Sequence, residues 1–238
     1  MLDKRRIMQK VKIKDVLSPS FRDFQRPLKP MVVVAHDSDF CQEVVAKGWL
    51  TKEQMAHAAA RYRLGKSNSG KCIFWMIDEL GQVRDGRLGT SWVSVMLKAR
   101  EPELLRGWYA KHCLFGLHLL KPAATVCVVE AERSAVVLSE LFPEYLWMAV
   151  MEDTYFTLDL LEPLQANRVV IYPHTDMTQD NFLCWEEMAD EARRTYQLDI
   201  TVSDVLEKHA SQEQKQRSID LLSYLEVRGE SLEVRGKR

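Results

Sequence analysis

The sequence lacks any apolar run long enough to cross a membrane. Its longest such stretch, residues 123–129 interrupted by Thr125, falls far short of the roughly 20 residues that a membrane helix needs. The charged first residues are not followed by the apolar segment of a secretory signal. We therefore expect a soluble, cytoplasmic protein with no membrane partner, and its 46% apolar residues suffice for a real core.

Cysteine is too scattered for a disulfide framework or a zinc ribbon. The five cysteines form no CxxC pair, and their number is odd. The sequence also has no GxGxxG, Walker, HExxH or GxSxG motif, so it carries no signature of nucleotide hydrolysis, zinc proteolysis or esterase chemistry. We expect the cysteines to be reduced thiols in the core.

Net charge is small as well, at −1, so bulk electrostatics gives no case for nucleic acid binding. The charge is nevertheless uneven, because residues 1–30 hold nine lysines and arginines against three aspartates. We interpret this segment as a basic extended arm with one short strand at residues 11–16. Such an arm suits phosphate contacts, and a solvated terminus explains it equally well.

Residues 31–120 are expected to form a small α+β subdomain around an antiparallel hairpin. The hairpin prediction rests on two strand-like runs that flank a turn containing Gly81. The second predicted helix has Thr51 as its N-cap and an alanine-rich body. The predicted strands are residues 71–78 and 82–88, and the predicted helices are residues 39–45, 51–62, 91–98 and 101–109.

From residue 125 onward, short apolar runs alternate with helical segments. Such alternation predicts a parallel sheet with right-handed crossovers, whose uniformly apolar strands are buried on both faces. The predicted strands are residues 125–129, 146–151, 168–172 and 199–202, and the helices between them are residues 132–141, 158–164 and 181–196. We assign residues 121–205 to this α/β domain. Residues 206–238 are expected to be a polar tail, helical at first, then disordered, that no apolar residue anchors.

Acidic residues and one histidine follow the predicted parallel strands, at the edge where such sheets bind ligands. They are Glu130 and Glu132 after the first strand, Glu152 and Asp153 after the second, and His174 and Asp176 after the third. Carboxylates that converge there suit Mg²⁺, which prefers oxygen ligands and would in turn hold phosphates. Acids of this kind more often only stabilise helix N-termini, and a lone histidine fits a turn or a core as well as a metal site.

Several segments occur in the order in which bacterial replicative primases carry them. Tyr62-Arg-Leu-Gly65 precedes the predicted hairpin, and Leu114-Phe-Gly-Leu117 follows it. Val128-Val-Glu-Ala-Glu-Arg-Ser-Ala135 and Tyr172-Pro-His-Thr-Asp176 come next. Over residues 60–205 the chain thus resembles the TOPRIM catalytic core of primases, and more closely the uncharacterised TOPRIM-related proteins of bacterial mobile elements.

The resemblance implies a TOPRIM-like sheet and a role for individual residues. Glu130 would be a general acid/base or metal ligand and Asp176 a ligand of Mg²⁺ or Mn²⁺. His174 stands where the family has the first aspartate of its Asp-x-Asp motif, so it would be a substitute ligand. The family's glycine after the second strand and its N-terminal zinc ribbon are absent, and a site with a histidine in place of a carboxylate should bind Mg²⁺ more weakly.

The resemblance also implies that the hairpin contacts phosphate groups of DNA or RNA. The basic residues concerned are Lys71, Arg84 and Arg87. Three functions follow. The first is a primase-like protein that binds nucleic acid and carries out metal-dependent nucleotidyl or phosphoryl transfer, with a helicase or mobilisation protein as partner. The second is a catalytically degenerate TOPRIM module that acts in DNA binding or protein interaction on a mobile element. The third is another doubly wound domain with a small ligand at the same strand ends.

Overall fold

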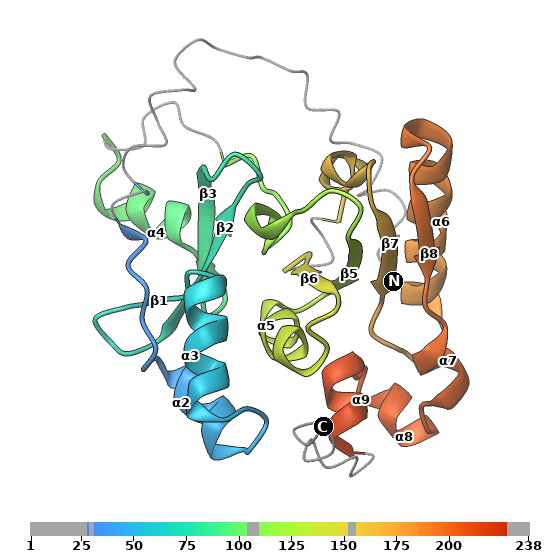
Figure 1. Cartoon of the computed structure of the whole chain (residues 1–238), viewed down its shortest axis with the longest axis horizontal. Coiled ribbons are helices and arrows are strands. Elements are labelled where there is room, and N and C mark those ends of the chain that lie inside the picture. Colours follow the sequence, from blue (N-terminus) through green and yellow to red (C-terminus); the bar gives the residue numbers. More distant parts are fainter. Residues whose placement is uncertain (1–27, 29–30, 104–109, 152–155, 228–238) are drawn as a thin grey trace.

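The computed structural model describes residues 28, 31–103, 110–151 and 156–227 (Figure 1). The basic arm at residues 1–30 and most of the helix predicted at residues 101–109 therefore lie outside the described residues. The same is true of Glu152 and Asp153. In the described part of the chain, no helix has both the length and the apolar character that spanning a membrane requires.

The described residues form two four-stranded sheets, seen side by side in Figure 1, and their pairing confirms the predicted fold class. The first is antiparallel with the strand order β1-β2-β3-β4, and the second is parallel with the order β6-β5-β7-β8. The strands are β1 Gly65–Lys66, β2 Cys72–Ile77, β3 Val83–Leu88, β4 Ser91–Trp92, β5 Thr125–Val129, β6 Leu146–Ala149, β7 Arg168–Tyr172 and β8 Asp199–Val202. The chain is thus an α/β protein with an antiparallel hairpin in its first half and a parallel sheet in its second.

The helices follow the sequence signals closely in most places. The helix after Thr51 begins there because the Thr51 side chain accepts from the Gln54 amide and the Gln54 side chain accepts from the Thr51 amide. The α-helices are α2 Asp39–Ala46, α3 Lys52–Arg61, α4 Val93–Arg100, α5 Glu132–Leu141, α6 Asp180–Tyr196, α7 Val205–His209, α8 Gln212–Gln216 and α9 Leu221–Val227. Three 3₁₀ turns are η3 Leu117–Leu119, η5 Leu158–Leu160 and η6 Glu162–Leu164.

The helix predicted at residues 158–164 is wrong. Two 3₁₀ turns, η5 and η6, occupy this segment instead. Pro163 gives the physical reason, because proline has no amide hydrogen for the bond that would continue an α-helix through η5 into η6.

The segment before η3 joins the two sheets. Phe115 exchanges backbone hydrogen bonds of 2.9 and 3.1 Å with Ala149 of β6, and the Tyr62 ring stacks on Phe115 at a centroid distance of 5.1 Å. The Tyr62 hydroxyl donates to the Trp147 carbonyl at 2.8 Å. Gly116 has a φ of +87°, and a Cβ there would lie 3.0 Å from the Tyr62 ring and 3.1 Å from the Trp147 oxygen. Glycine is therefore required where the sheets meet.

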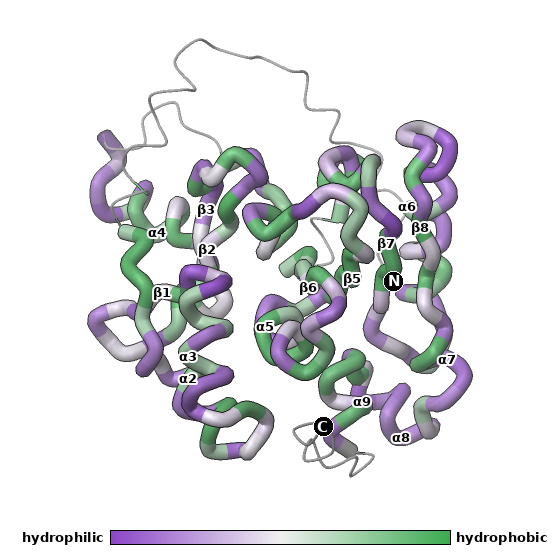
Figure 2. The backbone as a smooth tube through the Cα atoms, in the orientation of Figure 1, coloured by the Kyte–Doolittle hydropathy of each residue, from purple (hydrophilic) through white to green (hydrophobic). Residues whose placement is uncertain are grey.

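One hydrophobic core crosses the predicted boundary at residue 120. It extends from Phe40 of α2 to Leu222 of α9, and Figure 2 shows its most apolar part on β5, β6 and α5. The subdomain boundaries stay predictions, although this core makes the two halves continuous.

The expectation that no apolar residue anchors the C-terminal tail is wrong for residues 219–224. Leu221 and Leu222 are buried in the main core, where α9 packs on α5, and Ile219 and Tyr224 form a smaller cluster with Leu206. The sequence did not predict this because the apolar residues at 219–224 are few and the segment around them is polar.

Candidate functional site

Glu130 and His174 meet at the carboxyl edge of the parallel sheet. They follow β5 and β7, which are neighbours in the sheet and pair Val129 with Tyr172 in register. His174 Nδ1 is hydrogen-bonded to Glu130 Oε2, and the two side chains are 20% and 28% exposed. The structure therefore brings these two predicted site residues into direct contact while leaving both accessible to a ligand.

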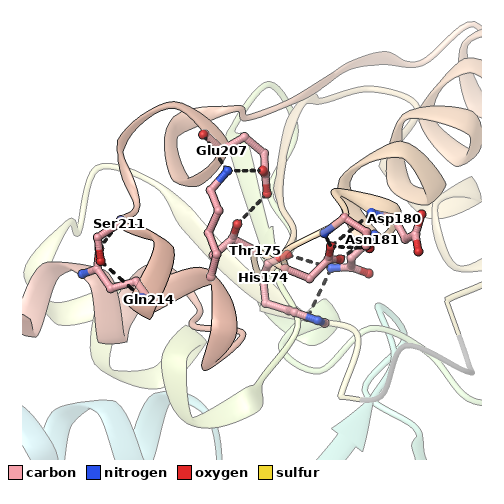
Figure 3. Close-up of polar contacts among 10 residues, drawn as sticks. His174, Thr175, Asp180, Asn181, Glu207, Ser211 and Gln214 are labelled. Atoms are coloured by element: carbon pink, nitrogen blue, oxygen red, sulfur yellow. Dashed lines mark hydrogen bonds and ion pairs between the residues drawn. The ribbon is translucent and has the colours of Figure 1, made fainter.

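Asn181 holds His174 in place from the first turn of α6 (Figure 3). Its Nδ2 donates to the His174 carbonyl at 3.0 Å and lies 3.2 Å from His174 Nδ1. A single ring nitrogen cannot donate to Glu130 and accept from Asn181 at once, so we assign the Nδ1 proton to the contact with the charged carboxylate. Sequence reasoning missed Asn181, because its position predicted only a place in a helix.

Asp176 accepts hydrogen bonds at the start of α6, and its role as a metal ligand stays a prediction. Its Oδ1 accepts from the Thr178 amide at 2.8 Å, the Thr178 hydroxyl at 3.0 Å and the Asp180 amide at 3.2 Å. Its Oδ2 accepts from the Asn181 amide at 2.9 Å. Burial raises the pKa of Asp176, but the hydrogen bonds from the Asn181, Thr178 and Asp180 amides outweigh burial and lower it below its ordinary value. Asp176 therefore caps the start of α6.

The described residues, which do not include Glu152 and Asp153, offer few ligands for a Mg²⁺ ion at this edge. Within the described ranges, no three or more His, Cys, Asp or Glu side chains are grouped so as to hold a metal. Glu130 and His174 would supply one carboxylate and one imidazole, and the oxygens of Asp176 are occupied by α6. Since Mg²⁺ prefers oxygen ligands in an octahedron, the metal implied by the resemblance finds no support in this geometry.

Arg87 reaches this edge from the other sheet. It lies in β3, and its Nη1 donates to the carbonyl of Met151, just after β6. The Met151 amide in turn donates to the Glu130 carbonyl at 2.8 Å. Arg87 Nε donates to the Gly89 carbonyl at 3.1 Å, and the guanidinium lies 5.9 Å from the centre of the Trp92 ring. The positive charge of Arg87 is therefore held near Glu130, with Met151 in contact with both residues.

Glu132 is a buried carboxylate at the start of α5, with only 8% of its surface exposed. Burial raises the pKa of this carboxyl, and the nearby positive charges of Arg87 and Arg133 oppose that rise.

The three predicted phosphate contacts do not form one cluster. Arg84 is bound to Asp78, with Nη2 and Nε at 2.5 and 2.7 Å from one carboxylate oxygen. The pairing of β2 with β3 shifts register at Arg84, and Arg84 and Arg87 have different partners, Asp78 for the first and the carbonyls of Met151 and Gly89 for the second. Lys71 is exposed immediately before β2. Of the three, Arg87 is the residue that lies beside Glu130.

The C-terminal helices cover the same edge, which sequence reasoning missed. Thr175 donates through its hydroxyl to Glu207 at 2.7 Å, and Lys215 donates to the other Glu207 oxygen at 2.9 Å (Figure 3). Ser134 of α5 donates to Asp220, just before α9. The site is therefore bordered by the β7–α6 loop, the start of α5 and the segment that carries α7 to α9.

Comparisons with known proteins name one family and return weak likenesses to solved structures. Two solved structures resemble this chain, each with a TM-score of 0.38. One is the primase fragment of the bacteriophage T7 primase-helicase protein, at 12% identity over 68% of this chain and 70% of that one. The other is the DnaG primase catalytic domain bound to single-stranded DNA, at 15% identity over 90% of this chain and 79% of that one. Likenesses of this size support no functional conclusion.

No curated protein matches the chain. A family model described as a domain of unknown function, DUF6371, matches residues 38–175. That match covers more than half of the chain, contains Glu130, Arg87 and His174, and ends one residue before Asp176. The chain therefore belongs to the DUF6371 family.

Proposed function

We propose that this protein is a TOPRIM-like module that binds nucleic acid through backbone phosphates at the carboxyl edge of its parallel sheet. The position of Arg87 carries the proposal. Its guanidinium is anchored by the carbonyls of Met151 and Gly89, and a guanidinium has five N–H donors in a planar fork that matches phosphate oxygens. An arginine fixed in this way keeps donors for a phosphate without losing its orientation.

Trp92 adds a second element of such a site. Its half-buried ring lies near the Arg87 guanidinium and packs at a tilt of 34° against His112, at a centroid distance of 4.3 Å. Proteins that bind single strands combine basic side chains with aromatic rings on which bases stack. The pairing of Arg87 with Trp92 favours single-stranded nucleic acid, as DNA or RNA.

The proposal requires no metal at this edge, in line with the occupied Asp176 carboxylate. It corresponds to the catalytically degenerate module among the functions considered from sequence, acting on a mobile element with a helicase or mobilisation protein as its partner. Because Glu130 carries a negative charge near the expected phosphate, Glu130→Gln should leave nucleic acid affinity unchanged or improve it.

A second candidate function is metal-dependent nucleotidyl or phosphoryl transfer. The hydrogen-bonded Glu130–His174 pair favours it, since such a pair suits proton transfer at a reacting group. Calorimetric titration of Mg²⁺ and of Mn²⁺ separates the candidates. Saturable binding that Glu130→Gln abolishes supports transfer, and no binding at millimolar metal supports the metal-free module.

The direct test measures fluorescence anisotropy of labelled single-stranded DNA and RNA over a series of salt concentrations. We expect Arg87→Gln to weaken binding about tenfold and to reduce the slope of log Kd against log salt by about 0.7, the value for one lost phosphate contact on a single strand. The matched control is Arg168→Gln, at an exposed residue at the start of β7. Equal losses in both variants would mean unspecific charge attraction and would contradict the proposal.

A further inference from the structure

A cavity of about 390 Å³, open on one side, lies between the first sheet and the η5–η6 segment, and neither Glu130 nor His174 lines it. It is enclosed by the β2–β3 turn, the residues that precede η3, and the η5–η6 segment, which lie in the upper part of Figure 1. The η5–η6 segment leads into the start of β7, whereas Glu130 and His174 follow the ends of their strands. The size falls within the range of about 300–1,000 Å³ that small-molecule sites occupy.

Arg84 lines one wall of this cavity in a fixed orientation. Its partner Asp78 has a side chain only 3% exposed and bonds to Nε and Nη2 of Arg84. The other Asp78 oxygen accepts from the amides of Leu80 and Gln82 at 3.0 and 2.7 Å. The amides of the β2–β3 turn therefore fix the Asp78 carboxylate, which in turn fixes the Arg84 guanidinium.

His112 lines the same wall and is also held by a buried carboxylate. Its Nε2 lies 3.5 Å from Asp85 Oδ2, and Asp85 is 0% exposed. Ser94 fixes Asp85 through its amide at 3.0 Å and its hydroxyl at 2.5 Å, and Trp92 packs on the imidazole ring. Two basic side chains thus face one cavity, each positioned by an aspartate that belongs to the core of the first sheet.

The wall formed by η5 and η6 has the opposite character. It presents two carboxylates and one amide, from Asp159, Glu162 and Gln165, while the first wall adds Lys111 at its rim. The exposed Glu79 is the one acid on the basic side besides Asp78. A simple anion would be repelled by the acidic wall and a simple cation by the basic wall, so the cavity suits a molecule with an anionic end and a donor-rich end.

We propose that this cavity binds a mononucleotide. Its phosphate would contact Arg84, His112 and Lys111, and the amino and hydroxyl donors of its base and ribose would face Glu162 and the rest of the acidic wall. The volume exceeds what one phosphate ion fills and is too small for an oligonucleotide. Arg87 does not line this cavity, so the proposal does not depend on the nucleic acid function proposed above, although Trp92 contacts both His112 and the Arg87 guanidinium.

The test is calorimetric titration of the full chain with AMP, GMP, CMP and UMP in turn, with inorganic phosphate as the comparison. We expect saturable binding of at least one nucleotide at one site per chain. Lys111→Gln and Glu162→Gln change exposed residues and should leave the melting temperature unaltered while each weakens binding about tenfold, the effect of one lost charged hydrogen bond. The matched control is Lys121→Gln, at an exposed lysine outside the cavity lining.

Three results would overturn the proposal. Absence of saturation at millimolar nucleotide would mean no site. Binding of inorganic phosphate as tight as that of every nucleotide would mean a plain anion site. An equal loss in Lys121→Gln or in Arg87→Gln would place the ligand elsewhere. Arg87→Gln should weaken the binding of oligonucleotides and leave the binding of mononucleotides unchanged. The failure of one proposal is therefore distinguishable from the failure of the other.

Discussion

The two sheets use their carboxylates in different ways. In the antiparallel sheet, Asp78 and Asp85 are buried and their oxygens hold the β2–β3 turn, Arg84 and Ser94 in place. At the carboxyl edge of the parallel sheet, Glu130 keeps 28% of its side chain exposed and touches a histidine that is itself 20% exposed. The buried carboxylates with several hydrogen bonds stabilise the fold, whereas the partly exposed Glu130 is one that a ligand can reach.

The residues that suggested a primase-like core divide along the same line. Tyr62, Phe115 and Gly116 join the two sheets by stacking, hydrogen bonding and close backbone approach. Glu130 and His174 make no comparable contribution to packing. The motif resemblance in the first half of the chain therefore falls on residues that hold the sheets together, whereas in the second half it falls on a pair that a ligand can reach and on Asp176, which holds the start of α6.

The largest effect is expected from Asp78→Ala. This change leaves the Arg84 guanidinium and two backbone amides without their buried acceptor, and breaking one side of a buried ion pair costs about 3–5 kcal/mol. Urea unfolding followed by circular dichroism measures it. The control is Asp159→Ala at an exposed residue, which should stay within about 0.5 kcal/mol of wild type. Similar losses in the two variants would remove the distinction between buried and exposed acids.

The junction of the sheets is tested by Gly116→Ala against Gly48→Ala. Both glycines have positive φ, +87° and +71°, so both substitutions carry backbone strain of about 1–2 kcal/mol. Only the Cβ at residue 116 would also press on Tyr62 and the Trp147 carbonyl, since nothing lies within 4 Å at residue 48. We expect Gly116→Ala to lower the free energy of unfolding by about 1 kcal/mol more than Gly48→Ala does, because the Trp147 backbone cannot easily move aside. The urea midpoints of the two variants measure this difference. Equal midpoints would mean that the sheets have room to separate.

Most of the fold could be predicted because its signals are local. The segments that became β5, β7 and β8 are strands with the predicted bounds, and Thr51 caps α3 as its side chain indicated. The expectation of burial on both faces is wrong for β8, which lies at the edge of the sheet and alternates exposed with buried residues. The interpretation failed where long-range contacts decide. Apolar residues of α9 are too few to define a helix by periodicity, and only α5 packing against them explains their burial.

The site could be predicted in part, for the same reason. Parallel pairing of β5 with β7 brings Glu130 and His174 together, and that pairing follows from the order of strands. Whether Asp176 and Arg84 are available to a ligand depends instead on the groups to which their side chains bond. An aspartate at a helix start and an arginine across a turn from Asp78 each have a structural use that spacing alone does not separate from a functional one.

A smaller effect, dependent on pH, is expected from Asp176→Asn. The folded protein lowers the pKa of Asp176, so its charged form stabilises the fold above the ordinary pKa of about 3.9, and this contribution disappears as pH falls through the lower folded value. We expect a loss of about 1 kcal/mol at pH 7 that fades in strong acid. Melting temperatures at both pH values measure it, with Asp199→Asn, at an exposed aspartate in β8, as control. If the loss of stability in Asp176→Asn were the same at both pH values, the negative charge of Asp176 would not be what stabilises the start of α6.

The smallest effect is expected from Glu130→Gln, and it sharpens the comparison most. The pair with His174 is partly exposed, and glutamine keeps an oxygen to accept from Nδ1, so stability should change by less than about 1 kcal/mol. The matched variant is Glu207→Gln, whose side chain is 9% exposed and bonded to both Thr175 and Lys215, and it should lose more. Urea midpoints of both variants decide the matter. Should Glu130→Gln lose as much as Glu207→Gln, Glu130 would belong with the structural carboxylates, and its exposure would no longer mark the edge at which a ligand binds.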